Sequence, residues 1–135
     1  MGAPEVDRPG GPEIEMRRYQ SGDVRLAADL AGPADGAPVL LLHGGGQTRG
    51  AWGGALVEGA RRGFRMISAD LRGHGESDWS PAADYTLTAL AADVGAILST
   101  LDGPAFVVGA SMGGAAALAY AAEGRKLAGL GLVDV

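Results

Sequence analysis

Hydrophobic positions change their spacing along the chain in a way that separates strands from helices. Short apolar runs that end at glycine or at a charged residue are typical of strands buried on both faces of a parallel sheet, as in P-V-L-L-L at residues 38–42. Hydrophobic residues three and four positions apart indicate helices, most clearly from Leu87 to Leu101, where Thr86 is placed to cap the first turn. These patterns predict strands at 14–19, 24–30, 38–42, 64–69, 105–108 and 127–133, and helices at 51–62, 87–101 and 112–123.

The order of these elements predicts the architecture. The first two strands flank Q-S-G-D at residues 20–23, which suits a hairpin turn. From residue 38 onward strands alternate with helices, which predicts an α/β fold with a mostly parallel, twisted sheet flanked by helices. Residues 1–13 are rich in glycine, proline and charge and are expected to form a flexible leader, with residues 14–135 as the folded part.

Composition narrows the possible functions. The chain has 135 residues, 47% of them hydrophobic and 20% charged, which suits a single globular domain. Its 11 Lys and Arg residues stand against 16 Asp and Glu residues, and this net charge of −5 argues against a nucleic-acid or anionic membrane partner. The chain has no cysteine, so disulfides and thiolate metal sites are absent, in keeping with a cytoplasmic protein. We expect no metal and no membrane association.

The strongest chemical signal is a G-x-S-x-G motif, Gly109 to Gly113, between a predicted strand and a predicted helix. Such a turn lifts the serine hydroxyl clear of the sheet, and its glycines avoid a clash between a Cβ atom and the neighbouring backbone. The helix that follows directs its N-terminus at the centre where negative charge develops. This context predicts that Ser111 is a nucleophile; the alternative is a glycine-rich turn that contains a serine by chance.

A second glycine-rich loop, H-G-G-G at residues 43–46, follows the strand at 38–42. Its backbone N–H groups, together with the N–H of Met112, can hold the oxyanion of a tetrahedral intermediate. The competing interpretation is a phosphate site. It is disfavoured because the loop has neither a G-x-G-x-x-G pattern in register with a helix nor the lysine of a P-loop.

A third segment, D-L-R-G-H-G-E-S at residues 70–77, forms a polar loop broken by glycine. Asp70 and Arg72 are placed to form a local ion pair, and a catalytic role for either is disfavoured.

Taken together, H-G-G-G-Q at 43–47, D-L-R-G-H-G-E-S at 70–77 and G-A-S-M-G-G at 109–114 resemble the α/β-hydrolase superfamily, in its esterase and cofactor-free peroxidase branch. The similarity runs from about Met16 to Val135. It implies a fold of the kind predicted above and a reaction without a cofactor.

The resemblance also implies roles for individual residues. Ser111 corresponds to the nucleophile, and the N–H groups of Gly45 and Met112 correspond to the oxyanion hole. Other residues of the two glycine-rich segments would shape the site without reacting: His43, Gly44, Gly46, Gly109 and Gly113. The resemblance implies the same for the loop from Arg72 to Ser77.

One part of the family pattern is missing. In the family, the catalytic acid and histidine follow the nucleophile in chain order. After Ser111 this sequence has no histidine, and its acids are Glu123 and Asp134. We therefore expect an α/β-hydrolase core truncated after the strand that follows the nucleophile helix. A missing C-terminal half or a second chain would supply the acid and the histidine. The strand at 127–133 is then expected to be an exposed apolar edge.

The sequence favours a serine-dependent hydrolase that acts on a small-molecule ester or acyl substrate through an acyl-enzyme on Ser111. Perhydrolysis by a cofactor-free peroxidase of the same fold uses the same intermediate and stays open. Epoxide hydrolases and dehalogenases are disfavoured, because in those members of the fold an aspartate stands where this chain has Ser111. His43 as a substitute base is a minor alternative, and His74 a weaker one. A non-catalytic binding or assembly module is the alternative from another class.

Overall fold

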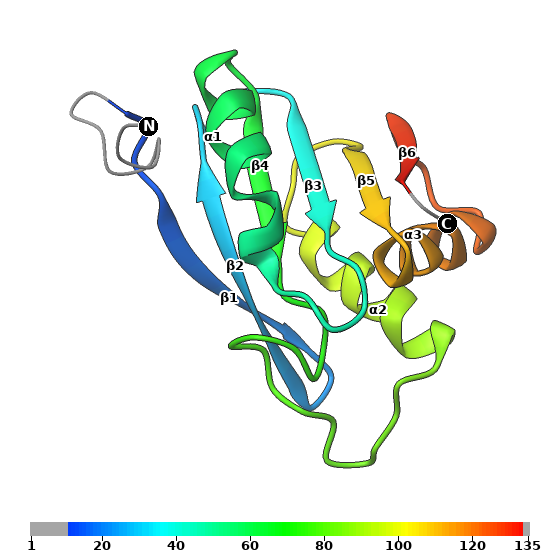
Figure 1. The fold of residues 1–135 in the computed structure, drawn as a ribbon. Helices are drawn as coiled ribbons and strands as arrows, with labels where there is room; N and C mark the ends of the chain where they lie inside the picture. The colour runs from blue at the N-terminus through cyan, green and yellow to red at the C-terminus, as the bar shows by residue number, and fades with distance from the viewer. Residues whose placement is uncertain (1–10, 134–135) are drawn as a thin grey trace.

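The computed structural model describes residues 11–133, and a single six-stranded sheet forms its centre (Figure 1). The first ten residues of the expected leader, and also Asp134, lie outside the described residues. The strands are β1 (Glu15–Ser21), β2 (Val24–Ala31), β3 (Pro38–Leu42), β4 (Arg65–Ala69), β5 (Phe106–Ala110) and β6 (Gly129–Val133). The helices are the 3₁₀ turn η2 (Arg49–Trp52), α1 (Gly53–Arg61), α2 (Leu87–Leu98) and α3 (Met112–Ala122).

The strand order is β1-β2-β4-β3-β5-β6. β1 and β2 form the expected antiparallel hairpin, and β2 also pairs antiparallel with β4. The other pairs, β4 with β3, β3 with β5 and β5 with β6, are parallel. The prediction of a mostly parallel sheet with flanking helices is therefore confirmed. Because β3 and β5 are parallel neighbours, the loops that follow them emerge at the same end of the sheet.

Helices cover both faces of the sheet (Figure 1). α2 and α3 pack on one face with side chains such as Leu40 and Leu42, whereas α1 packs on the other face with Leu41. This alternation explains the continuous apolar run in β3, since a strand covered on both faces needs hydrophobic residues at every position. Within residues 11–133, no helix combines the length and the apolar character needed to cross a membrane.

Most element boundaries differ from the sequence-based prediction by one to three residues; α2, for example, ends at Leu98 and β6 begins at Gly129. The helix predicted at 51–62 begins as the 3₁₀ turn η2, and its regular part starts at Gly53. The strand predicted at 105–108 continues to Ala110, because the Gly109 and Ala110 backbone still pairs with β6. These shifts lie at element ends, where side-chain pattern gives the weakest information.

The N-terminus of α2 provides a direct stability test. The Thr86 hydroxyl accepts a hydrogen bond from the N–H of Ala89 (3.2 Å), as its position in the sequence predicted. Thr86→Ala removes this acceptor and is expected to lower the free energy of unfolding by about 1 kcal/mol in urea denaturation. Thr88→Ala, on the exposed side of the same helix turn, is the control and should leave stability unchanged or slightly raised. Equal losses in the two variants would contradict the capping role.

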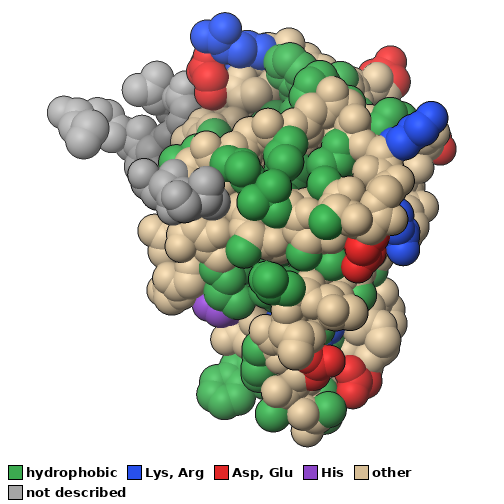
Figure 2. All heavy atoms as spheres, turned by 90° about the vertical axis from the view of Figure 1, so that its right-hand side faces the viewer, with side chains coloured by type: hydrophobic (Ala, Val, Ile, Leu, Met, Phe, Trp, Pro, Cys, Tyr) green, Lys and Arg blue, Asp and Glu red, His purple; other side chains and the backbone are tan. Residues whose placement is uncertain are grey.

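β6 lies at one edge of the described sheet and carries exposed apolar side chains. Leu130, Leu132 and Val133 are each about two-fifths exposed, at 39%, 38% and 41%, as are Phe106 and Leu118 beside them at 42% and 45%. Viewed from this side, hydrophobic side chains spread across the face with few charges near its centre (Figure 2). The expected apolar edge strand is therefore present among the described residues.

Candidate active site

Ser111 occupies the turn between β5 and α3 and is exposed. Its backbone has φ 49° and ψ −111°, a conformation that side-chain-bearing residues rarely adopt and that costs about 1–3 kcal/mol. The turn is held from both sides, because the Ser111 N–H donates to the carbonyl of Val133 (3.0 Å) and its carbonyl accepts from the N–H of Ala115 (2.9 Å). The strained backbone of Ser111 lowers the stability of the fold, and these hydrogen bonds hold its hydroxyl at the end of the sheet despite that cost.

The two glycines that flank Ser111 pack tightly against backbone. A Cβ atom on Gly109 would lie 2.4 Å from the carbonyl oxygen of Gly113, and one on Gly113 would lie 2.4 Å from the carbonyl oxygen of Leu42. Real Cβ atoms do not approach backbone so closely, so Gly109 lets the start of α3 pack against β5 and Gly113 lets it pack against the end of β3. These contacts give the physical reason for the G-x-S-x-G spacing in this chain.

The loop after β3 lies directly beside Ser111 and Met112. A Cβ atom built on Gly44 would be 3.6 Å from the Ser111 Cβ, and one built on Gly45 would be 3.6 Å from the Met112 sulfur. Gln47 closes this loop, since its side-chain oxygen accepts from the Gly44 N–H (3.0 Å) and its own N–H donates to the Gly44 carbonyl (3.1 Å). The fold therefore brings together the two glycine-rich segments that the sequence singled out.

Two backbone N–H groups beside Ser111, those of Gly45 and Met112, have no acceptor among residues 11–133. The hydrogen bonds among the described residues include the N–H groups of Gly44 and Gly46 but not that of Gly45. Met112 is the first residue of α3, and the first N–H groups of a helix have no acceptor within it. Unpaired N–H groups beside an exposed serine can stabilise an oxyanion that forms there.

His43 is fully buried and engaged at both ring nitrogens. Its Nε2 accepts the N–H of Leu71 (3.0 Å), so the neutral ring carries its proton on Nδ1, which donates to the carbonyl of Gly44 (2.7 Å). Burial lowers the pKa of His43 below the ordinary histidine value and holds the ring neutral. His43 therefore supports the loop and has no nitrogen left to take a proton from Ser111.

This lowered pKa predicts a pH dependence of stability. The unfolded chain protonates His43 near its ordinary pKa, whereas the folded chain resists protonation, so stability is complete above about pH 6.5 and falls as the pH drops. We expect a loss of at most about 1.4 kcal/mol per pH unit, measured by urea unfolding between about pH 7.5 and pH 5.5. His43→Gln keeps an acceptor for Leu71 without titrating, so its slope should be flatter. Identical slopes would contradict this assignment.

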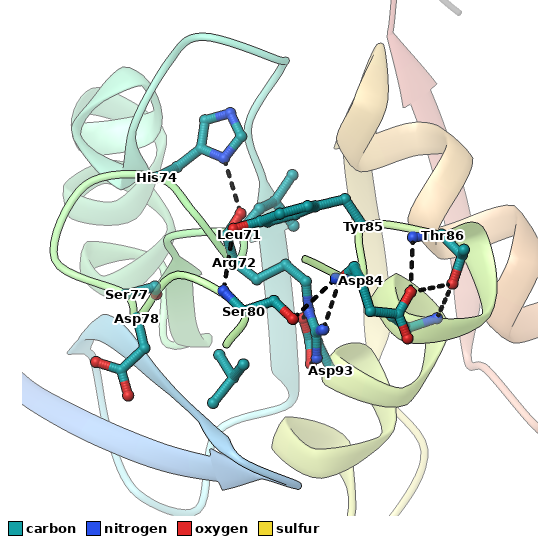
Figure 3. Close-up of polar contacts among 12 residues, drawn as sticks. Leu71, Arg72, His74, Ser77, Asp78, Ser80, Asp84, Tyr85, Thr86 and Asp93 are labelled. Atoms are coloured by element: carbon teal, nitrogen blue, oxygen red, sulfur yellow. Dashed lines mark hydrogen bonds and ion pairs between the residues drawn. The ribbon is translucent and has the colours of Figure 1, made fainter. Parts of the chain in front are cut away.

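His74 was the least favoured alternative base in the sequence, and the structure places it against the same loop. Its Nε2 accepts the N–H of Gly46 (3.1 Å). Its Nδ1 donates to the carbonyl of Arg72 (3.0 Å), as Figure 3 shows. The rings of His43 and His74 lie 5.0 Å apart. Residues 11–133 contain both histidines of the sequence, so no imidazole nitrogen in the described chain is left for Ser111.

The prediction of an ion pair between Asp70 and Arg72 is wrong. Asp70 is fully buried and accepts instead from the backbone N–H and the guanidinium of Arg49, at 2.6 and 2.5 Å. Arg72 binds both carboxylate oxygens of Asp93 on α2, at 2.7 Å each (Figure 3). Buried charges need closely fitted partners, and these come from elements distant in the sequence.

Arg49 is the site-proximal residue that sequence reasoning missed. Besides Asp70, its guanidinium contacts Glu76 (2.6 Å) and Asp29 (3.0 Å), which joins the loop after β3 to the 70–77 loop. No motif identifies it in the sequence, since its partners lie far away along the chain. Among the described residues, histidine, aspartate and glutamate form no group of three or more that could hold a metal ion.

Comparisons with known proteins agree with this architecture. The family described as alpha/beta hydrolase fold matches residues 37–130. The chain is 36% identical over 140 residues to protein phosphatase methylesterase 1 of Mus musculus, covering 97% of this chain and 33% of that protein. It is 35% identical over 127 residues to an esterase of Mycobacterium tuberculosis, covering 93% of this chain and 41% of that protein. An uncharacterized protein of Mycobacterium tuberculosis is 41% identical over 117 residues, with 86% of this chain and 33% of that protein covered.

Solved structures give the same result. An epoxide hydrolase from Vigna radiata superposes with a TM-score of 0.84 at 25% identity, over 91% of this chain and 40% of that one. The thioesterase domain from the curacin biosynthetic pathway superposes with a TM-score of 0.80 at 27% identity, over 90% of this chain and 46% of that one. The chain thus spans about a third to under a half of the length of these relatives. With its sheet order, its serine turn and a family match over residues 37–130, the chain belongs to the α/β-hydrolase fold family.

Proposed function

We propose that Ser111 is the nucleophile of an esterase and that the N–H groups of Gly45 and Met112 form its oxyanion hole. The observation that carries this proposal is the backbone of Ser111, which is held at φ 49° between two glycines that no other residue can replace without a clash. Because Ser111 is exposed, packing does not account for its strained backbone. Presentation of the hydroxyl to a substrate does.

The proposed chemistry is acyl transfer in two steps. The general base takes the proton of the Ser111 hydroxyl as its Oγ attacks the ester carbonyl, and the negative charge that forms on the carbonyl oxygen is stabilised by the two N–H groups. The protonated base gives this proton to the leaving alcohol; it then takes a proton from water, which attacks the acyl-enzyme, and returns it to the Ser111 Oγ as the acid is released. Two relatives named as a methylesterase and an esterase support an ester substrate. A serine at position 111, where epoxide hydrolases use aspartate, also favours ester chemistry.

The general base comes from outside the described residues in this proposal. Both histidines of the sequence are occupied by backbone partners, so Ser111 needs an imidazole from another segment. The exposed apolar edge at β6 offers a surface on which that segment packs. A C-terminal half of this protein is favoured as its source, because the relatives are more than twice as long as the matched region; a second chain is the alternative.

Two other functions stay open. Perhydrolysis proceeds through the same acyl-enzyme, with peroxide in place of water, and product analysis with and without peroxide separates it from hydrolysis. A binding or assembly module is the alternative that the β6 edge favours, since strand addition needs such an exposed edge.

The test is covalent labelling with a fluorophosphonate, read by intact mass and peptide mapping. We prepare the 135-residue chain and a form extended to the length of its relatives. The extended form should gain one adduct on Ser111, and the 135-residue chain should react much more slowly because it lacks a free imidazole. A folded extended form that reacts with no fluorophosphonate and hydrolyses no ester would overturn the proposal and favour the binding module.

A further inference from the structure

The loop after β3 and the 70–77 loop exchange hydrogen bonds through their histidines. His43 belongs to the first loop and accepts the N–H of Leu71 from the second (3.0 Å). His74 belongs to the second loop and accepts the N–H of Gly46 from the first (3.1 Å). Each loop thus holds the other by one imidazole, and Gly46 directly follows Gly45, whose N–H is proposed to face the oxyanion.

The 70–77 loop is rigid enough to act as a support. Gly75 has φ 51°, and a Cβ atom there would lie 2.4 Å from the Asp70 carboxylate, so the loop packs closely on a buried ion pair. The Ser77 hydroxyl donates to the carbonyl of Asp70 (2.7 Å) and accepts the N–H of Ala27 from β2 (2.9 Å). His74 itself is fixed on this loop by the bond from its Nδ1 to the Arg72 carbonyl.

The loop that bears Gly45 is held on its N-terminal side by the Gly44 carbonyl, which accepts from His43 Nδ1 (2.7 Å) and from the Gln47 N–H (3.1 Å). Gly45, Gly46 and Gln47 are nevertheless exposed to solvent. On the C-terminal side of Gly45, the bond from the Gly46 N–H to His74 Nε2 holds the next peptide unit (3.1 Å). An oxyanion donor that is not held in advance loses most of its effect on rate.

We propose that His74 is a positioning residue for the oxyanion hole: its Nε2 accepts the Gly46 N–H and holds the peptide unit that follows Gly45, while His43 and Gln47 hold the Gly44 carbonyl in the peptide unit that carries the Gly45 N–H. His74 does not contact the substrate and moves no proton in the reaction. This inference rests on the proposed function for its kinetic consequence, but the tether between His74 and Gly46 can be tested without any activity.

Two substitutions of His74 distinguish the role of Nε2 from that of Nδ1. His74→Gln places an amide oxygen near the position of Nε2, so it keeps an acceptor for the Gly46 N–H. His74→Asn is shorter and reaches the position of Nδ1, so it keeps a partner for the Arg72 carbonyl and leaves Gly46 without an acceptor. The two side chains are chemically matched, and each removes the imidazole.

The variants are compared in the full chain that the gene encodes, with a p-nitrophenyl ester as substrate. We expect His74→Asn to lower kcat by about 10–100-fold with KM within about twofold of wild type, because a displaced donor acts in the transition state. His74→Gln should stay within about threefold of wild type in kcat. Hydrogen exchange of the Gly46 amide should accelerate at least tenfold in His74→Asn and stay near wild type in His74→Gln.

Equal kcat values in the two variants, or a loss that appears in KM, would overturn the positioning role. Gly46 exchange that is the same in both variants and in wild type would show that the tether does not hold the loop. If the wild-type protein hydrolyses no ester and takes up no fluorophosphonate, the proposed function fails, and the exchange measurement still decides on the tether. A global unfolding midpoint that falls in His74→Asn but not in His74→Gln, with exchange faster throughout the chain, would mean that His74 has only a structural role.

Discussion

Ser111→Ala is expected to reduce ester hydrolysis by the extended protein about 10⁵–10⁶-fold, since removal of a serine nucleophile leaves only the oxyanion hole and binding to act on the substrate. Steady-state rates with a p-nitrophenyl ester, together with loss of the fluorophosphonate adduct, measure this effect. Ser99→Ala is the matched control, because Ser99 is also exposed and its hydroxyl bonds only a carbonyl of its own helix turn. A Ser111→Ala protein that keeps more than a tenth of the wild-type rate would exclude Ser111 as the nucleophile.

A second substitution at position 111 should show that the backbone conformation of Ser111 lowers the stability of the fold. Glycine adopts φ 49° without strain, so Ser111→Gly is expected to raise the free energy of unfolding by about 1 kcal/mol while abolishing hydrolysis. Urea denaturation measures the first effect and the ester assay the second. A Ser111→Gly variant less stable than wild type would mean that the turn is not strained by its side chain.

Gly113→Ala is expected to destabilise the fold by about 3 kcal/mol or more, because the added methyl group would lie 2.4 Å from the Leu42 carbonyl oxygen. To relieve this contact, α3 must move away from β3, and Met112 and Ser111 move with it. The expected result in urea denaturation is a much lower midpoint, or a failure to fold. Residual folded protein should react with fluorophosphonate far more slowly than wild type.

A second glycine-to-alanine substitution in a helix gives the control. Gly54 lies in α1 with no atom within 4 Å of an added Cβ, so Gly54→Ala should stabilise the protein by about 0.5–1 kcal/mol through helix propensity. The two substitutions make the same chemical change with opposite expected signs. If Gly113→Ala were also neutral or stabilising, the close approach of α3 to β3 would not be what requires glycine there.

The sequence predicts the fold well where burial controls the pattern. β3 is found at residues 38–42 as predicted, because a strand covered on both faces must be apolar at every position. The turn at Ser111 is equally readable, since the strand, the glycines and the helix are contiguous in the chain. The positions of Gly44 and Gly45 beside Ser111 and Met112 follow from the parallel pairing of β3 with β5.

The polar network around the site could not be predicted in the same way. Arg49 pairs with Asp70, and Arg72 with Asp93, across 21 residues in each case, and spacing alone carries no information about such partners. The expected pair between Asp70 and Arg72 relied on closeness in sequence. Burial instead selected partners with bidentate or multiple contacts. The resemblance placed the loop from Arg72 to Ser77 beside the site, but it did not predict the bond from His74 to Gly46, because that bond depends on how two loops meet.

The hydrogen bond from the Ser111 N–H to the Val133 carbonyl joins the proposed nucleophile to β6, an edge strand of the described sheet. If β6 binds a partner and Ser111 is acylated as proposed, the two events are linked equilibria. A molecule that docks on β6 and favours one position of Val133 changes the stability of the serine turn. By thermodynamic reciprocity, an acyl group on the serine that alters the turn changes the affinity of the edge for that molecule by the same factor. Affinity at the sheet edge would then report the acylation state of the protein.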